Sequence, residues 1–369
     1  MRECRAYIEK ARRGAIMETQ AIVADRIYLD HAATTQVLPA ARAAMADALA
    51  RWANPSSPHA EGRAARAALE DARARIKAAL GWNYELIFTS GASEAASLAL
   101  TRAKAHTCAV SAVEHDAIRR AVPGASIIAV DDRGIAQLDA WPECALVAIQ
   151  TVNSETGICQ PLDAIAAATR EKGCLWIADA AQSAGKVALP DADLIVVSAH
   201  KLGGPPGIGA LLIKDVQVLA PSGGQEKGYR GGTENLPAAV GFAAALEARG
   251  SRDHLAALRK RLDDGVRAAG GAIVAEHGTR LPEIASYRLP GVAAAAQLIE
   301  LDMAGIAVSA GSACSSGTLK PSAVLTAMGW REEEAREVIR VSFAPETQAA
   351  DVERFLHIWT ALAARRRAA

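Results

Sequence analysis

The chain has 369 residues, with 41 basic and 41 acidic side chains, so its formal net charge is zero. This balance gives no global field that would favour nucleic acid or a membrane surface as a partner. Apolar residues make up 51% of the chain, enough for a full core, yet no apolar run approaches the length of a membrane span. The length predicts one large domain and a smaller one.

Residues 1–26 are predicted to be an N-terminal extension that carries no signal about function. The segment is basic at first but lacks the long apolar stretch of a secretory signal. Met17 is an alternative start of translation, because the interpretable pattern begins only at Ile27. We therefore place the start of the folded protein near residue 27.

From about residue 86, short apolar runs alternate with helical patterns. Helices are predicted at 93–103, 117–121 and 162–172, and a helical charge pattern covers 63–80. Such alternation indicates an α/β fold with a mostly parallel sheet covered on both faces, and such sheets bind ligands at the carboxyl ends of their strands. The seven predicted strands are 86–89, 108–113, 126–130, 145–150, 174–178, 194–198 and 208–213.

The remaining sequence predicts a smaller α+β domain. A long helical region at 235–267, broken near Gly250, links the two parts. We expect a large domain at 27–265 and a small C-terminal domain at 266–369. The predicted elements of the small domain are strands at 272–274, 283–288, 307–309 and 338–343, and helices near 294–304 and at 349–366.

Six cysteines are scattered along the chain, without the paired spacing of a zinc site or a disulfide framework. This usage fits the reducing cytoplasm, where we expect the protein to work. Cys108 and Cys174 lie in or beside apolar runs and are interpreted as small buried side chains. The full set is Cys4, Cys108, Cys144, Cys159, Cys174 and Cys314.

Two segments carry the strongest chemical signal. In Ser198-Ala199-His200-Lys201, the lysine follows a buried-strand pattern, and burial lowers the pKa of a lysine, which gives a neutral amine that can form a Schiff base. In the segment GSACSSG at 311–317, Cys314 lies among small residues and can act as a nucleophile. By itself Cys314 is more simply an inert loop thiol. Lysine, aldehyde cofactor and thiol together indicate chemistry on a sulfur-bearing amino acid.

Other polar residues that follow predicted strands are candidate cofactor ligands. Ala92 and Ser93 open a helix, and the free N–H groups of a helix start hold phosphate, although a simple cap is the more ordinary interpretation of Ser93. Asp179 either keeps a pyridinium nitrogen protonated or is a surface carboxylate. Gln182 would lie at the same strand end and donate a hydrogen bond to a ring hydroxyl.

Three further residues each have a functional and a structural interpretation. His115 stacks on an aromatic cofactor or, more commonly for a lone histidine, has a structural role. His200 is a phosphate partner or a packing neighbour of Lys201. Arg340 is costly to bury without an anion, so it either clamps a substrate carboxylate or forms an internal salt bridge.

Taken in order, these segments resemble the cysteine desulfurases of the iron–sulfur-cluster and nitrogen-fixation type, within the class V aminotransferase family of pyridoxal-phosphate enzymes. The resemblance runs from Ile27 to about Phe343. It implies a fold-type I transferase, in which a large domain with a mostly parallel seven-stranded sheet is joined to a smaller α+β C-terminal domain. The motifs that carry it are YLDHAATT (28–35), NPSSPH (54–59), TSGASE (89–94), DAAQS (179–183), SAHK (198–201), RGGTEN (230–235) and GSACSSG (311–317).

The resemblance implies a cofactor, pyridoxal 5′-phosphate, and a role for each matching position. Lys201 would bind the cofactor covalently, and Asp179 would pair with its ring nitrogen. Gln182 would bond the phenolic oxygen, while His115 would stack on the ring and help to move protons. The phosphate would be held by Ser93, Ser198 and His200, with Ala92 as a further contact.

The resemblance also implies a substrate and partners. Arg340 would clamp the carboxylate of L-cysteine, and Cys314 would take the sulfur as a persulfide while L-alanine leaves. Thr233 would reach the phosphate of the partner subunit's cofactor, which requires a homodimer. The sulfur would pass to an iron–sulfur scaffold or another acceptor protein. The sequence after Arg340 is shorter than in the family's housekeeping members, in which this tail helps to bind the scaffold.

One departure from the family pattern lies at 153–155. The chain has Asn153-Ser154-Glu155 where family members usually carry Asn-Asn-Glu. The second asparagine normally contacts cofactor or substrate, so Ser154 puts that contact in doubt. A water bridge is one replacement for it. Asn153 is retained as a candidate cofactor and substrate contact.

Two other classes of function compete with a desulfurase. Another class V enzyme, an aminotransferase or a selenocysteine lyase, would not need Cys314. A non-enzymatic, cofactor-binding homologue is the second alternative, and Lys201, Asp179 and Arg340 argue against it. Turnover of L-cysteine by wild type and by Cys314→Ala separates the three.

Overall fold

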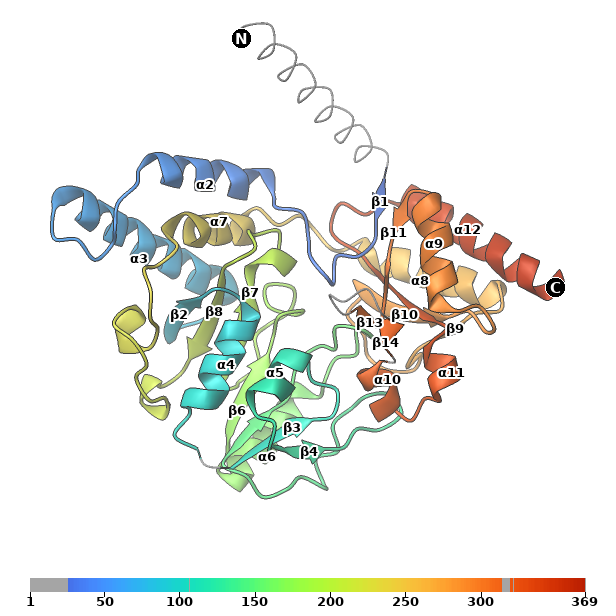
Figure 1. Cartoon of the computed structure of the whole chain (residues 1–369), viewed down its shortest axis with the longest axis horizontal. Coiled ribbons are helices and arrows are strands. Elements are labelled where there is room, and N and C mark those ends of the chain that lie inside the picture. Colours follow the sequence, from blue (N-terminus) through green and yellow to red (C-terminus); the bar gives the residue numbers. More distant parts are fainter. Residues whose placement is uncertain (1–25, 106, 314–318, 321, 369) are drawn as a thin grey trace, which may run out of the picture.

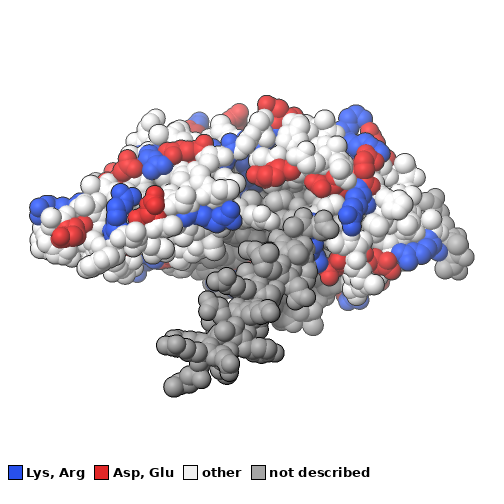
Figure 2. Space-filling model, turned by 90° about the horizontal axis from the view of Figure 1, so that it is seen from above, with Lys and Arg blue, Asp and Glu red and all other residues white. Residues whose placement is uncertain are grey.

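The computed structural model describes residues 26–368 except 106, 314–318 and 321. Figure 1 shows two parts side by side: a seven-stranded sheet with helices on both faces, and a smaller unit around a four-stranded sheet. Over the face seen in Figure 2, acidic and basic side chains are interspersed, in line with the zero net charge. Among the helices of the described chain, none is long and apolar enough to cross a membrane.

The large sheet confirms the predicted α/β fold. Its strand order is β2-β8-β7-β6-β5-β3-β4; β8 runs antiparallel to both of its neighbours, and the other strands share one direction. All five residues of β7 are buried, as expected for a strand covered on both faces. The strands are β2 (Glu85–Thr89), β3 (Cys108–Ser111), β4 (Ser126–Ile128), β5 (Leu146–Ala148), β6 (Leu175–Asp179), β7 (Leu194–Ser198) and β8 (Gly209–Ile213).

Helices cover both faces of this sheet. One core packs the strands against α3 (Ala60–Leu80), α6 (Leu162–Lys172) and α7 (Leu236–Glu247). A second core packs them against α4 (Ala92–Arg102) and α5 (Asp116–Ala121). Helix α2 (Pro39–Ala50) packs on α7, outside this layer, and was not predicted; in it only Ala41 and Ala48 are buried, so its sequence shows no apolar stripe.

The smaller unit is built on a four-stranded antiparallel sheet of order β12-β15-β10-β9. Its core also includes Leu29 and residues of α8, so it draws on chain that precedes residue 266; the boundary at 265/266 stays a prediction. The elements are α8 (Leu255–Ala268), β9 (Ala272–Ile273), β10 (Ile284–Arg288), α9 (Ala294–Met303), β12 (Ser309–Ala310), β15 (Val338–Ser342) and α12 (Ala349–Ala368).

The expected strand at 307–309 is wrong as a single element. Strand β11 (Ile306–Ala307) pairs in parallel with β1 (Ile27–Tyr28), whereas β12 pairs with β15. The segment is divided because its two ends pair with different partners. The pairing with β1 places the start of the described chain against the C-terminal unit (Figure 1).

Four short elements after β12 were not predicted. Strands β13 (Ser312–Ala313) and β14 (Leu319–Lys320) pair antiparallel and are followed by α10 (Ala323–Ala327) and α11 (Glu332–Ala335). An apolar cluster packs Val324 and Leu325 of α10 against Val113 and Val130 of the large-sheet part. This cluster joins the two parts of the protein beside the site described next.

Candidate active site

A cavity of about 380 Å³ opens where strands β2, β3, β5, β6 and β7 reach their carboxyl ends. Side chains at such ends converge because parallel strands finish at the same edge of a sheet. Eight of the predicted residues line this cavity. They are Ala92, Ser93, His115, Asp179, Gln182, Ser198, His200 and Lys201.

Lys201 lies on a 3-10 turn, η1 (Ala199–Lys201), directly after the buried strand β7. Burial lowers the pKa of its ammonium, and the charge of Arg340 lowers it further, while Asp179 and Asp30 act in the opposite direction. A lysine held in this way gives up its proton more readily than an exposed one, as a nucleophilic amine requires.

One end of the cavity suits a phosphate. Ser198 is 1% exposed, and its hydroxyl oxygen has no hydrogen-bond partner among the described residues. The start of α4 faces the same space with Ser93, next to Gly91, whose φ of +152° and open surroundings leave the backbone accessible. The pKa of His200 is lowered to about 4, by burial and then by Lys201, and its Nδ1 lies 3.1 Å from Thr34 Oγ1.

Other residues at the cavity suit a polar ring. Asp179 ends β6, and its Oδ1 accepts a hydrogen bond from Ala181 N at 2.9 Å, which fixes the carboxylate at the strand end. Gln182 donates from Nε2 to Ala32 O at 2.9 Å, while its buried Oε1 has no partner in the described chain. His115 is held as the N-cap of α5, where its Nδ1 accepts from Ala117 N at 3.1 Å.

Arg340 lies beside this cavity rather than in its lining. It is 6% exposed; Nη2 is 2.8 Å from Asp30 Oδ1, and Nη1 donates to Ser154 O at 3.1 Å. The buried Nε has no partner among the described residues. The internal salt bridge is therefore present, and a donor is left for an anion.

Asn153 and Ser154 differ in their relation to the cavity, because only Ser154 lines it. Asn153 Oδ1 accepts hydrogen bonds from Glu155 N and Thr156 N, both at 2.9 Å, and its Nδ2 donates to Val113 O. Its side chain is thus used within the turn and does not line the cavity, whereas Ser154 does. A cofactor or substrate contact by Asn153 stays a prediction.

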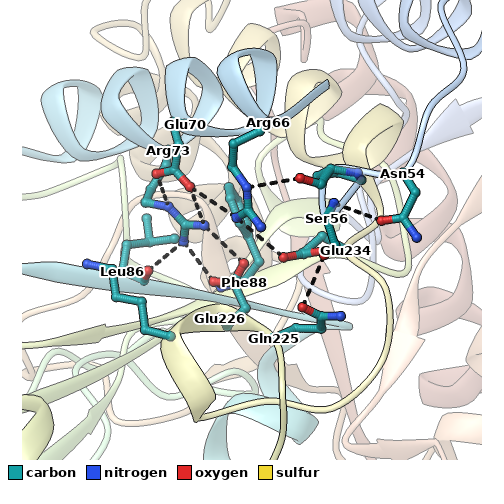
Figure 3. Close-up of polar contacts among 12 residues, drawn as sticks. Asn54, Ser56, Arg66, Glu70, Arg73, Leu86, Phe88, Gln225, Glu226 and Glu234 are labelled. Carbon is teal, nitrogen blue, oxygen red and sulfur yellow. Dashed lines mark hydrogen bonds and ion pairs between the residues drawn. The ribbon is translucent and has the colours of Figure 1, made fainter. Parts of the chain in front are cut away.

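Thr233 is exposed and lies outside the cavity, on a loop fixed by a buried ion pair. Figure 3 shows Arg73 of α3 reaching Glu226, with Nη1–Oε2 at 2.7 Å and Nη2–Oε1 at 3.0 Å. Glu226 also accepts from Phe88 N, and its φ of 48° is a left-handed conformation that costs a non-glycine residue energy. The ion pair thus stabilises the strained backbone at Glu226, in the loop that also carries Thr233.

Cys314 lies outside the described residues. The chain on either side of it is described: β13 and β14 pair antiparallel between Gly311 and Ser322.

Sequence reasoning missed two carboxylates at the site, Asp30 and Glu114. Asp30 belongs to a motif quoted above, but its contact with Arg340 joins residues 310 positions apart, which no local pattern reveals. Glu114 is 3% exposed, and burial raises its pKa to about 8, with the charge of Asp179 acting in the same direction. The sequence signal for Glu114 was its position as a charged residue directly after the apolar run 108–113.

A mostly parallel sheet with a buried lysine and an aspartate on neighbouring strand ends defines the class: a pyridoxal-phosphate-dependent enzyme of fold type I. The family model "Aminotransferase class-V" matches residues 27–355. The chain is 36% identical to a cysteine desulfurase of Gluconacetobacter diazotrophicus, over 92% of this chain and 94% of that protein. A cysteine desulfurase of Archaeoglobus fulgidus is 33% identical, over 90% and 95% of the two chains.

Solved structures agree with this assignment. A NifS-like protein from Rickettsia africae superposes with a TM-score of 0.81 at 30% identity, covering 91% of this chain and 99% of that one. The chain therefore belongs to the class V aminotransferase family, within the group of the cysteine desulfurases.

Proposed function

We propose that this protein is a pyridoxal-phosphate-dependent cysteine desulfurase that converts L-cysteine to L-alanine and takes the sulfur onto Cys314 as a persulfide. One observation carries the proposal: Lys201 shares a cavity with Asp179 and lies within the electrostatic influence of Arg340. A related protein, 28% identical and with a TM-score of 0.75, has been solved in complex with cysteine.

The residues of the cavity fit the cofactor. Bound there, pyridoxal 5′-phosphate supplies an aldehyde that condenses with amines and a ring that withdraws electrons. The unpartnered hydroxyl of Ser198, the start of α4 with Ala92 and Ser93, and His200 would hold its phosphate. Asp179 would pair with the ring nitrogen, Gln182 would bond the ring oxygen, and His115 would lie against the ring.

Lys201 and Arg340 act on the substrate. Arg340 would bind the carboxylate of L-cysteine through its remaining donor capacity, which orients the Cα–H bond. The neutral Lys201 amine would accept the Cα proton, because its lowered pKa makes the unprotonated form accessible.

Cys314 completes the sulfur transfer. Its thiolate attacks the sulfur of the substrate, and an S–S bond forms as the Cβ–S bond breaks. The electron pair of the Cβ–S bond stays with the amino-acid part, which takes up a proton and leaves as L-alanine. The sulfur is thereby oxidised to the persulfide level while the β-carbon is reduced, and no external oxidant is needed.

We further propose a homodimer in which Thr233 completes the partner's phosphate site. The exposed Thr233 supports this, together with exposed apolar side chains at the end of α2, Leu49 (63%) and Trp52 (81%). The stretch after them contacts the same loop, since Ser56 Oγ lies 3.4 Å from Gln225 Oε1 (Figure 3). The sulfur acceptor, an iron–sulfur scaffold or another carrier protein, and the cytoplasm as the place of action remain predictions from the sequence.

The test is turnover of L-cysteine by the cofactor-loaded protein, with alanine and sulfide quantified for wild type and Cys314→Ala. Equal alanine and sulfide in wild type, both lost in the variant, are the expected result. Alanine formation that survives the substitution would indicate a selenocysteine lyase or an aminotransferase. Absence of turnover of any amino acid would leave a cofactor-binding homologue.

A further inference from the structure

A carboxylate lies where the phosphate of the cofactor would bind. Glu94 lines the cavity next to Ala92 and Ser93, at the start of α4. The N–H groups of residues 91–94 have no acceptor among the described residues, and the buried, unpartnered hydroxyl of Ser198 lines the same cavity. A phosphate dianion in this place would meet a negative side chain, which opposes binding unless its charge is compensated.

Arg230 compensates the charge of Glu94. Its Nε donates to Glu94 Oε1 at 2.9 Å, and Nη2 lies 3.4 Å from Oε2. The side chains of Arg230 and Glu94 are 18% and 32% exposed, so water reaches the pair only in part. Within the part of the chain that the structure describes, no second arginine or lysine forms an ion pair with Glu94. One cation, 136 positions away in sequence, therefore neutralises this carboxylate.

Glu94 also orders the turn before α4, because its Oε2 accepts a hydrogen bond from Ser90 N. Burial acts to raise the pKa of Glu94. The hydrogen bonds from Ser90 and Arg230 outweigh burial, so the pKa is lowered and the carboxylate is ionised at neutral pH. Arg230 itself does not line the cavity. Its effect on a bound phosphate would therefore pass through Glu94.

We propose that Arg230 is a positioning residue of the phosphate site: it cancels the charge of Glu94, so that the free N–H groups at the start of α4 can hold the phosphate of pyridoxal 5′-phosphate. The proposal rests on the function proposed above and adds a residue to its cofactor site. It assigns Arg230 no contact with cofactor or substrate. A purely structural role competes with it, because Arg230 is close to Thr233 in sequence and its ion pair also ties that segment to α4.

The first measurement is the dissociation constant of the cofactor. The cofactor-loaded protein is dialysed against falling concentrations of pyridoxal 5′-phosphate, without substrate, and the bound fraction is read from its absorbance. Arg230→Gln should raise the dissociation constant by about fivefold or more, because Glu94 is left uncompensated beside the phosphate. Glu94→Gln should bind the cofactor at least as tightly as wild type, because its side-chain carbonyl can still accept from Ser90 while the charge is gone.

The two roles of Arg230 predict opposite results for a double variant. If Arg230 compensates charge, Arg230→Gln combined with Glu94→Gln should return the dissociation constant to within about twofold of wild type. If Arg230 only holds the segment of Thr233, Glu94→Gln and the double variant should both bind the cofactor as weakly as Arg230→Gln, and the proposal is wrong. Lys227→Gln is the matched control: it removes a positive charge from the same loop, where Lys227 pairs with Glu85 outside the cavity, and should match wild type.

Pyridoxal, which lacks the phosphate, gives a second readout. In the same dialysis with pyridoxal, Arg230→Gln should stay within about twofold of wild type, because no phosphate meets Glu94. Equal weakening with both compounds, or an unchanged affinity of Arg230→Gln for pyridoxal 5′-phosphate, would overturn the proposal. A wild type that binds the cofactor but does not convert L-cysteine would refute the proposed function, and the dissociation constants would still decide the role of Arg230.

Discussion

Arg340 and Asp30 form a salt bridge of 2.8 Å between Nη2 and Oδ1, across 310 positions of sequence. It joins the chain that follows β1 to strand β15, and Asp30 also forms an isolated parallel bridge with Ser342. The carboxylate of Asp30 compensates the charge of the buried guanidinium and fixes the plane in which its remaining donor points. The structural and functional interpretations of Arg340 are therefore compatible: the salt bridge orients the group that would bind the substrate carboxylate.

Arg340→Lys should lower kcat/KM for L-cysteine by about tenfold to a hundredfold, because a lysine cannot serve Asp30, Ser154 O and a carboxylate through one planar fork. The loss should fall mainly on KM, since the proton transfer assigned to Lys201 is untouched. Steady-state kinetics of the cofactor-loaded protein measure it. Arg336→Lys, an exposed position on the same segment, is the control and should behave as wild type.

Glu114→Gln should flatten the dependence of stability on pH. The carboxyl of Glu114 accepts hydrogen bonds at Oε1 from Ser111 Oγ and Gln150 N, while its buried Oε2 has no partner among the described residues. Burial raises its pKa from 4.5 to about 8 in the folded state. Between these values the folded protein keeps a proton that the unfolded chain loses, so the free energy of unfolding falls as pH rises.

The expected cost in wild type is a few kcal/mol, reached fully above pH 8. Urea unfolding midpoints from pH 4.5 to 8.5 measure it: wild type should lose stability relative to Glu114→Gln across this range. Glu276→Gln, at an exposed position, is the control: its unfolding midpoint should change with pH as that of wild type does. Parallel curves for Glu114→Gln and wild type would show that Glu114 ionises normally.

Glu226→Gln should destabilise the protein by about 3 kcal/mol, because it removes the buried anionic partner of Arg73 and leaves only Glu70, whose side chain is half exposed. A second arginine of α3, Arg75, provides the control through its ion pair with Glu247 of α7. Arg75 and Glu247 are bonded at 2.7 Å but partly exposed, so Glu247→Gln should cost at most about 1 kcal/mol. Shifts in the urea midpoint compare the two. Equal shifts would contradict the assignment of Arg73–Glu226 as a buried pair that supports the loop of Thr233.

The sequence predicted those parts of the site that local patterns determine. Strand β7 is a continuous apolar run that ends at Ser198, so both the strand and the position of Lys201 at its carboxyl end followed from neighbouring residues. The same holds for β6 and Asp179. Because β6 and β7 are neighbouring parallel strands, their carboxyl ends lie together, and Asp179 and Lys201 with them.

Contacts between distant segments could not be predicted in this way. The hydrogen bond from Ser322 to Glu155 spans 167 positions, and each residue by itself looks like an ordinary cap or turn residue. Strand β1 has two residues and exists because β11 lies beside it. Elements and contacts of this kind are determined by tertiary packing, which a single sequence does not show.

Hybrid dimers test whether Thr233 serves the partner's site. Thr233→Ala alone should weaken cofactor retention, and Lys201→Ala alone should abolish turnover. The hybrid dimer has one Lys201→Ala subunit and one Thr233→Ala subunit. If Thr233 acts across the interface, both changes fall in one of the two sites, and the other site is intact. Co-expression with two different tags and tandem purification yields this hybrid. We expect about half of the wild-type activity per dimer at low cofactor concentration, because one of the two sites contains only wild-type residues. If Thr233 instead served its own subunit, each site would carry one defect, and the hybrid would show no such recovery.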